Sequence, residues 1–218
     1  MRNRWLALLL VGFLALITLV FFALRIKPID LEKSKAAQEA TSTPITQPSV
    51  TFVNPSRGAE NPKLTLIEFA DFQCEHCMTL DSALQVALHT YPNEVRLVWK
   101  DLPNPSAHEQ AIPAAIAAHC ADRQGLFWPY HDALMARQSI LSTDQYLQIA
   151  RELKLDMDRF NNCFSDQDTM PIVEKDIQEG RALGIVATPT LFVGSQKIVG
   201  SITSEELLQI IQTELTQP

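Results

Sequence analysis

Cys74 and Cys77 are the residues of this chain whose type and spacing most directly support chemistry. The apolar run Leu64–Phe69 before them predicts a buried strand, and an amphipathic helical pattern follows them. At the start of that helix, Cys74 would meet free backbone N–H groups and the helix dipole, which stabilise a thiolate. Cys77 follows one turn later, within reach of a disulfide, so this strand-to-helix junction predicts a redox pair.

Two other interpretations of the cysteines stay open. They could be inert core residues, or they could form half of a zinc site. Zinc usually needs four ligands, and the sequence shows no second C-x-x-C and no H-x-H partner. In the redox interpretation, Cys74 is the exposed nucleophile and Cys77 resolves the mixed disulfide.

The two residues between the cysteines would tune the pair. His76 can donate to the Cys74 thiolate or place positive charge near it, which favours the reduced form and makes the disulfide more oxidising. Glu75 would act in the opposite direction, because a carboxylate beside a thiolate disfavours it. Alternatively, both are simply exposed residues at the start of a helix.

A proline far downstream is the second chemical signal. The segment Gly184–Val193 has the composition of a strand, but Pro189 cannot donate to a sheet ladder. A cis Thr188–Pro189 bond would resolve the conflict by turning the chain where the strand starts. The alternative is a trans proline that begins an edge strand.

In combination, these segments resemble the DsbA-like branch of the thioredoxin-fold disulfide oxidoreductases. The resemblance covers roughly residues 50 to 218. The matching elements are Glu68-Phe-x-Asp71-Phe-x-Cys74-x-His76-Cys77, Gly125-Leu-Phe-Trp128-x-x-His131-Asp132, Leu155-Asp-x-Asp158-x-Phe160 and Gly184-x-x-x-Thr188-Pro189-Thr190. It implies an α/β fold of the thioredoxin type with an inserted helical domain.

The resemblance also implies site roles. Thr188 and Pro189 would bind an extended substrate segment beside the disulfide. Glu68 matches the buried acid of the family and would relay the proton that Cys77 gains or loses; the alternative is a carboxylate at a sheet edge with a lysine partner. No cofactor is implied. Glu75 stands where strong oxidases of the family often have proline, which bears on how oxidising the pair is.

The predicted elements follow the same order. Ser49–Val53 would be a short edge strand, and Thr203 or Ser204 would cap a C-terminal helix. Further strands are predicted at 64–69, 95–99, 190–193 and 196–199, and a helix at about 75–90. Between them, helical patterns at 111–121, 127–136, 144–153, 157–164 and 172–183 would form the family's insertion, at about 104–183.

Cys120 and Cys163 both fall in this insertion, on patterns that would bury them. We expect a structural disulfide between two inserted helices. Two free buried thiols or a second redox pair are the alternatives. Three histidines (His108, His119 and His131) are expected to be packing or surface residues, and Asp71 a capping or loop residue.

The N-terminus carries a second type of signal. Trp5–Leu24 is an uncharged apolar run of about 20 residues, long enough to span a bilayer. It lacks a small-x-small cleavage site directly after it, which favours a retained anchor (1–24) over a cleaved signal peptide. Residues 25–49 would be a solvated tether before the domain at 50–218. Lysines and arginines flank both sides of the run and do not choose its orientation, so redox chemistry places the domain outside.

These observations predict a membrane-anchored, extracytoplasmic thiol:disulfide oxidoreductase that forms disulfides in cysteine-containing exported proteins. The resemblance implies a quinone-linked membrane partner that reoxidises it, and we expect a monomer. The alternatives are an isomerase or reductase of the same fold, or a non-catalytic peptide-binding or chaperone module. A formal net charge of −7 and the lack of a basic stripe argue against nucleic acid as a partner.

Overall fold

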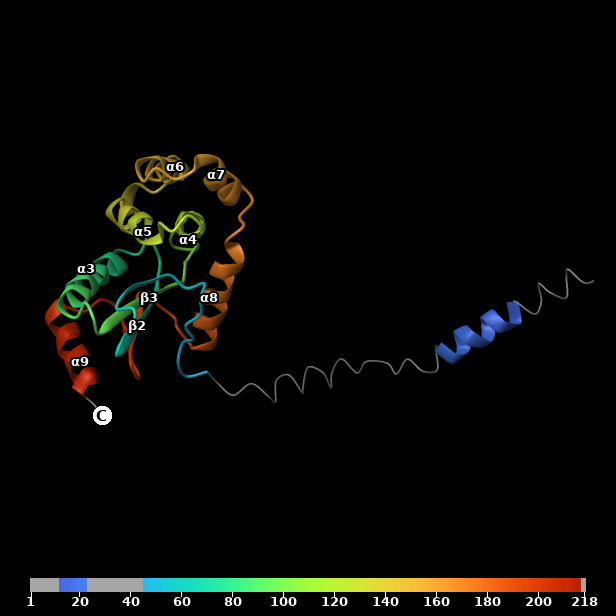
Figure 1. The fold of residues 1–218 in the computed structure, drawn as a ribbon, viewed down its shortest axis with the longest axis horizontal. Coiled ribbons are helices and arrows are strands. Elements are labelled where there is room, and N and C mark those ends of the chain that lie inside the picture. The colour runs from blue at the N-terminus through green and yellow to red at the C-terminus, as the bar shows by residue number, and fades with distance from the viewer. Residues whose placement is uncertain (1–11, 23–44, 217–218) are drawn as a thin grey trace, which may run out of the picture. The chain divides into compact units, whose positions relative to one another are not determined.

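A computed structural model describes residues 12–22 and 45–216 (Figure 1). Residues 44–218 form their own compact unit. The strands of this unit are β1 (Ser56–Gly58), β2 (Leu64–Ala70), β3 (Val95–Asp101), β4 (Thr190–Val193) and β5 (Gln196–Val199). Its helices are α3 (Glu75–Thr90), α4 (Ala111–Asp122), α5 (Phe127–Ala136), α6 (Thr143–Glu152), α7 (Met157–Ser165), α8 (Met170–Ala182) and α9 (Ser204–Thr216), with a 3-10 turn at Gln138–Ile140.

The strands form one mixed sheet in the order β1-β3-β2-β4-β5. β2 and β3 are parallel and are joined through α3, whereas β4 pairs antiparallel with β2 and with β5. β2 is the central strand, so Glu68 lies between Trp99 on one side and Leu191 on the other. Burial on both faces explains the nearly continuous apolar composition of β2.

Helices cover both faces of the sheet. α3 and α9 pack together on one face, where leucines 64, 66, 80, 84 and 97 meet leucines 191 and 207. α8 covers the other face, over Ile67, Phe69 and Val98 (Figure 1). Gly180 permits this close approach, since an added Cβ would lie 2.9 Å from the Leu102 side chain.

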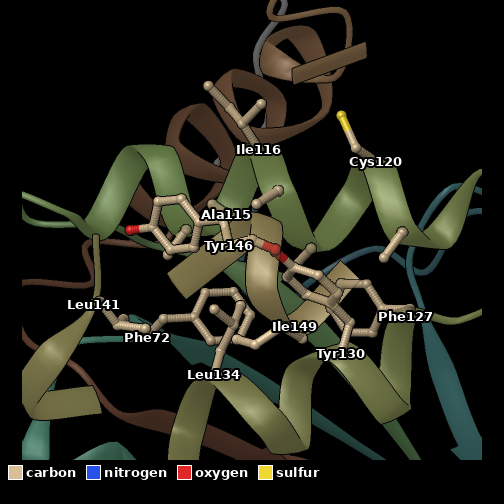
Figure 2. Close-up of a cluster of buried hydrophobic side chains, with 14 of the residues drawn as sticks. Phe72, Ala115, Ile116, Cys120, Phe127, Tyr130, Leu134, Leu141, Tyr146 and Ile149 are labelled. Carbon is tan, nitrogen blue, oxygen red and sulfur yellow. The ribbon is translucent and has the colours of Figure 1, made fainter. Parts of the chain in front are cut away.

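The insertion is built from α4, α5, α6 and α7, which gather beyond the end of the sheet (Figure 1). Its core is a cluster of aromatic and aliphatic side chains around Tyr130 and Tyr146 (Figure 2). The Tyr130 hydroxyl donates to the Tyr146 carbonyl oxygen at 2.9 Å, so this buried phenol is satisfied. Phe72, next to the redox motif, stacks on Trp99 and belongs to the same cluster, which ties the insertion to the motif.

The strands predicted at 64–69, 95–99, 190–193 and 196–199, the helix after the cysteines, the five helices predicted between residues 111 and 183, and the C-terminal helix are confirmed to within two residues at most ends. Thr203 is the cap of α9, because its hydroxyl accepts from the Glu206 N–H and the Glu206 carboxylate returns to the Thr203 N–H.

The prediction of an edge strand at Ser49–Val53 was wrong. Residues 51–54 form a turn, in which the Asn54 side chain accepts from the Thr51 N–H at 3.0 Å and the Asn54 N–H returns to the Thr51 carbonyl. A side chain that bonds its own neighbouring backbone competes with strand pairing. The edge strand is β1, which begins at Ser56 and pairs antiparallel with β3.

The predicted anchor Trp5–Leu24 is described only at residues 12–22, which are helical. Within the described ranges, no helix combines the length and apolar character that crossing a membrane requires. The rest of the predicted anchor and the first part of the predicted tether, residues 25–44, lie outside the described residues.

Candidate active site

Cys74 is the N-cap of α3. Its backbone is extended, with φ −81° and ψ 113°, and its sulfur accepts the Cys77 N–H at 3.3 Å. The thiol therefore receives one of the free N–H groups at the helix start, as the position of Cys74 predicted. Cys74 is 6% exposed whereas Cys77 is fully buried, so only Cys74 can be reached from solvent.

The two thiols differ strongly in acidity. The pKa of Cys74 is lowered to about 6, chiefly because the Cys77 side chain donates a hydrogen bond to its sulfur; burial opposes the shift, and hydrogen bonds from Thr188 and from the Cys77 backbone N–H add to it. Burial raises the pKa of Cys77 far above its ordinary value, and that same hydrogen bond and the Cys74 charge raise it further. The pair thus combines an accessible thiolate with a buried neutral thiol.

The proline loop lies directly beside Cys74. The Thr188–Pro189 bond is cis, which confirms the prediction and excludes the trans alternative. The Thr188 carbonyl oxygen lies 3.4 Å from the Cys74 sulfur and accepts from the thiol. Just before it, Val186 is 93% exposed, so this loop presents an apolar side chain to solvent.

Asp71 organises the loop between β2 and α3. Its buried carboxylate accepts from the Gln73 N–H, the Asn104 N–H and the His108 ring, each at 2.8 Å. Its backbone carbonyl accepts the Cys74 N–H at 3.0 Å. Of the predicted capping or loop role, the loop role is confirmed, since the N-cap of α3 is Cys74. His108 was expected only to pack or to face solvent, but it helps to hold this loop.

Gln138 is a site residue that sequence reasoning missed. It follows α5 in the 3-10 turn, and its amide donates to the carbonyl oxygens of Cys74 at 2.8 Å and of Phe72 at 3.0 Å. The insertion thereby braces the active-site turn. No motif marks a glutamine 64 positions away, so only the fold reveals this contact.

Two hollows lie near the active-site turn and the proline loop. One of about 510 Å³ lies between the start of α3, the 107–109 loop and the end of α5; residues that line it include Gln73, Glu75, Met78, His108 and Gln138. The other, of about 370 Å³, is lined by residues 102–106 and 185–188 together with Ile177 and Arg181. An extended chain crossing Cys74 would have recesses for its side chains on both sides.

Glu68 lies under the cysteines on the central strand and is 1% exposed. Within the described part of the chain, its Oε1 has no hydrogen-bond partner. Burial raises the pKa of this carboxyl well above its ordinary value, the nearby Asp81 raises it further, and Arg57 lowers it. Glu68 is thus neither at a sheet edge nor paired with a lysine, so that alternative was wrong.

Arg57, Asp81 and Asp132 form a charged group next to Glu68 that the sequence analysis did not identify. The Arg57 guanidinium binds Asp81 of α3 at 2.8 Å and Asp132 of α5 at 2.9 Å. The same guanidinium lies over the Trp128 ring, 4.2 Å from its centroid. The members of this group come from three elements far apart in sequence, so no local motif reveals the group.

His76 and Glu75 are both exposed. Among the residues that the structure describes, neither forms a hydrogen bond through its side chain or an ion pair. The structure places them beside Cys74 in sequence without a direct bond to its sulfur. Their tuning roles remain predictions.

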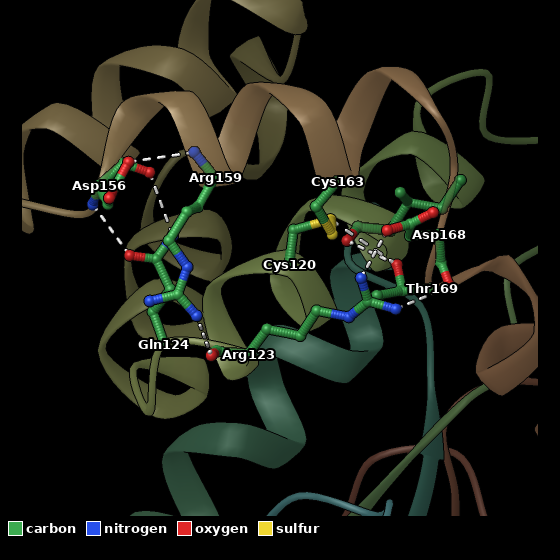
Figure 3. The surroundings of a disulfide bond; sticks show 9 residues. Cys120, Arg123, Gln124, Asp156, Arg159, Cys163, Asp168 and Thr169 are labelled. Atoms are coloured by element: carbon green, nitrogen blue, oxygen red, sulfur yellow. Dashed lines mark hydrogen bonds and ion pairs between the residues drawn. A yellow bond between two sulfur atoms is a disulfide. The ribbon is translucent and has the colours of Figure 1, made fainter.

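Cys120 and Cys163 are joined in a disulfide with a Cα–Cα distance of 5.8 Å (Figure 3). It links α4 to α7, as predicted, and excludes two free thiols. Both residues are buried, at 1% and 5% exposure, and Thr169 packs against the bridge. A buried bridge without access is suited to a structural role.

The zinc alternative finds no support in the site geometry. Among the described residues, the group of potential ligands that lies close enough is Asp81, His131 and Asp132, which contains no cysteine. Arg57 already binds both of its carboxylates. His131 itself is buried against Phe72 and Trp99, and His119 is buried against Phe127, as expected for packing residues.

Comparison with known proteins places the chain in a family. The thioredoxin family profile matches residues 52–213, so the chain belongs to the thioredoxin family. Fold and site together define a thioredoxin-fold protein with a C-x-x-C pair beside a cis-proline loop, which resembles the DsbA-like thiol:disulfide oxidoreductases. The curated relatives that match include a Na(+)/H(+) antiporter NhaA 3 of Salinispora tropica, 35% identical over 151 residues. That match covers 69% of this chain and 23% of the antiporter, so the chain spans less than a quarter of that relative's length.

Solved structures share the fold more completely. A periplasmic thioredoxin-like protein from Salmonella enterica serovar Typhimurium is 26% identical, with a TM-score of 0.64 over 76% of this chain and 91% of that one. A thioredoxin-like oxidoreductase from Silicibacter pomeroyi is 25% identical, with a TM-score of 0.67 over 77% and 95%. Oxidised BdbD from Bacillus subtilis, 18% identical, has a TM-score of 0.68 over 81% and 100%, a likeness of fold.

Proposed function

We propose that this protein is a membrane-anchored, extracytoplasmic oxidase that forms disulfides in exported proteins through Cys74 and Cys77. The observation that carries the proposal is the contrast between the two thiols: a reachable Cys74 whose pKa is lowered to about 6, above a fully buried Cys77. Stabilising the Cys74 thiolate favours the reduced form and therefore makes the disulfide a better oxidant.

The reaction runs in two exchanges. A substrate thiolate attacks the Cys74 sulfur of the Cys74–Cys77 disulfide; a substrate–Cys74 bond forms and Cys77 leaves as a thiolate. A second substrate thiolate then attacks the substrate sulfur of the mixed disulfide, and Cys74 leaves as a thiolate. The substrate loses two electrons and the protein gains them. The low pKa of Cys74 makes it a good leaving group in the second exchange.

Cys77 needs a proton in this cycle, since its buried thiolate is strongly disfavoured. Glu68 is the acid proposed to supply it and to take it back during reoxidation. Its buried carboxyl, raised pKa and free Oε1 support this role. Substrate would lie in an extended form along the Thr188–Pro189 loop, where the exposed Val186 and the two hollows accept side chains. His76 would add positive charge near the thiolate.

Location and partners belong to the same proposal. The uncharged apolar run Trp5–Leu24 supports an anchor that holds the domain at the membrane surface. The periplasmic assignment of the Salmonella relative and the requirement of a disulfide for an oxidising compartment support an extracytoplasmic position. A quinone-linked membrane protein is the proposed reoxidation partner, and cysteine-containing exported proteins are the proposed substrates.

Oxidation of a reduced dithiol peptide tests this proposal directly. Wild-type protein should oxidise it stoichiometrically, and Cys74→Ser should not. A double Cys120→Ala, Cys163→Ala variant controls for loss of a disulfide elsewhere and should retain the activity. Equal activity of wild type and Cys74→Ser would instead support a peptide-binding or chaperone module. Faster reshuffling of scrambled disulfides than net oxidation would support an isomerase.

A further inference from the structure

Arg57 occupies a position that the chemistry of the two cysteines does not by itself explain. It projects from the short edge strand β1, yet its side chain is only 18% exposed and both of its terminal nitrogens are bonded to carboxylates. One bond reaches Asp81 on α3, and the other reaches Asp132 on the inserted helix α5. The Trp128 ring covers the guanidinium, which removes water and strengthens both bonds.

The charges of this group act on the buried carboxyl of Glu68. Among the charges that act on the Glu68 carboxyl, Asp81 and Cys74 favour its neutral form, and Arg57 favours its ionised form. On the neighbouring strands β3 and β4, the residues paired with Glu68 are Trp99 and Leu191. Both are uncharged, so neither offsets the effect of these charges on Glu68. The charged and titratable groups that face Glu68 are thus Arg57 of β1, then Cys74, Cys77 and Asp81 of α3, with His131 and Asp132 of α5 behind Arg57.

The outer end of the group is held firmly. Although burial opposes it, a hydrogen bond from His131 and the Arg57 charge lower the pKa of Asp132. The His131 ring lies 2.8 Å from the Asp132 carboxylate and packs edge-on against Trp99. Asp132 therefore stays ionised and fixes the Arg57 guanidinium toward the acids beneath the cysteines.

We propose that Arg57 is a positioning residue for proton transfer at Cys77: it holds Asp81 beside Glu68, acts on the Glu68 carboxyl through its charge, and is fastened to the insertion through Asp132. The inference rests on the proposed relay by Glu68. It adds that Arg57 matters for one direction of the relay, the transfer of a proton from Cys77 to Glu68. Without the Arg57 charge, the pKa of Glu68 would rise further, so a larger fraction of the carboxyl would be protonated. A protonated Glu68 still donates a proton to the Cys77 thiolate when substrate is oxidised, but it cannot accept one from the Cys77 thiol.

The affected step is therefore closure of the Cys74–Cys77 disulfide. In reoxidation by glutathione disulfide, the Cys74 thiolate first attacks one sulfur and releases glutathione thiolate. Cys77 then passes its proton to Glu68 and attacks the Cys74 sulfur; the Cys74–Cys77 bond forms, and the bond to glutathione breaks with its electrons on the second glutathione thiolate. Arg57 acts on the second exchange only.

The test is single-turnover reoxidation of the reduced full-length protein by glutathione disulfide across a range of pH, with acid quenching to separate the mixed disulfide from the closed form. Arg57→Gln should leave formation of the mixed disulfide within about twofold and slow its closure by about tenfold, the effect of one pKa unit on the ionised fraction of Glu68. The closure profile should shift to higher pH. Arg57→Lys keeps the charge and should recover most of the rate.

Two controls separate proton transfer from general loosening of the fold. Arg123→Gln breaks an ion pair of the same type, to Asp168 beside the structural disulfide (Figure 3), and should change neither step. Asp132→Asn releases Arg57 from α5 without removing its charge, and should slow closure in the same direction by a smaller factor. If Arg57→Gln does not fold, this variant carries the test.

The decisive measurement uses Glu68→Gln as the background. If Arg57 acts through Glu68, adding Arg57→Gln to Glu68→Gln should produce no further slowing of closure. An equal slowing in both backgrounds, or equal slowing of both exchanges by Arg57→Gln, would overturn the inference about Arg57. The proposed oxidase would survive that result, because it depends on the Cys74→Ser comparison.

Discussion

The sulfur of Cys74 and the carbonyl oxygen of Thr188 lie 3.4 Å apart, although 114 positions separate them in sequence. The contact joins the start of α3 to the turn before β4, two segments that flank the central strand β2. In the neutral state the thiol donates to this carbonyl. A thiolate cannot donate, so ionisation of Cys74 would leave the Thr188 oxygen available to the N–H of the proposed substrate strand.

The acidity of Cys74 depends on its partner cysteine. Its pKa of about 6 arises chiefly from the hydrogen bond donated by the Cys77 side chain. We expect Cys77→Ala to raise the pKa of Cys74 by about one unit or more, since a hydrogen bond to a charged group contributes about 1.5–3 kcal/mol. Cys77→Ser keeps a donor and should raise it less. Ultraviolet thiolate absorbance against pH measures both; equal values in the two variants would contradict the assignment.

The reduced protein should gain stability relative to the oxidised protein as pH rises from about 6 toward 9. The Cys74 thiol ionises at about 6 when folded but near its ordinary value of 9.0 when unfolded. Its folded pKa is depressed, so its contribution is complete above the unfolded value and is lost as pH falls through the folded value. Within this window the slope approaches about 1.4 kcal/mol per pH unit.

Denaturant unfolding of both redox forms at several pH values measures this difference. The oxidised form is the control, because its two active-site sulfurs do not titrate. The raised pKa of Cys77 opposes the trend only as pH nears 9 and beyond, so the comparison belongs below that value. A flat difference between pH 6 and 8 would show that Cys74 is not activated.

Local pattern was sufficient for much of this architecture. The cysteines, the proline and the periodic leucines each act through their own backbone position, so strand, helix start and cis turn could be predicted from them. β3, however, continues past its predicted end at Trp99. Lys100 and Asp101 are charged, but the fold buries both and supplies partners, Asp176 at 2.9 Å and His119 at 2.6 Å.

The unpredicted part of the site shares one property: its residues act on the cysteines through side chains from distant elements. Gln138 reaches the Cys74 carbonyl from the turn after α5, and Arg57 reaches Asp81 from the edge strand. Neither residue belongs to a local motif. Their roles follow only from how the insertion packs against the sheet, which periodicity does not specify.

The Cys120–Cys163 bridge should contribute to stability and not to exchange. It closes a loop with a sequence separation of 43, which corresponds to about 4 kcal/mol in the chain-entropy model. We expect the double alanine variant to lose a free energy of unfolding of this order while oxidising a dithiol peptide at the wild-type rate. Mild reductant should open Cys74–Cys77 first. Loss of peptide oxidation at a temperature where the variant is still folded would show a redox role for the bridge.

Glu68→Gln should make the protein more stable and its disulfide slower to close. The folded pKa of Glu68 is raised by burial, so the stability associated with its protonated form is complete below the unfolded value and is lost as pH rises through the folded value. At neutral pH the buried carboxyl therefore lowers the free energy of unfolding. The glutamine amide has nearly the same shape but does not ionise, so it does not have this effect. The gain should grow with pH by up to about 1.4 kcal/mol per pH unit between the unfolded and the folded pKa of the carboxyl.

The pH dependence distinguishes this gain from improved packing. Glu68→Gln and wild type should have similar free energies of unfolding at pH 4, where the wild-type carboxyl is protonated in the folded state, and should diverge as pH rises. Closure of the Cys74–glutathione mixed disulfide should slow in the same variant, because Cys77 loses its proton acceptor. Glu205→Gln is the matched control, since Glu205 is an exposed carboxylate on α9, away from the cysteines. A variant that is stabilised equally at all pH values, or that closes its disulfide at the wild-type rate, would remove Glu68 from the proton path.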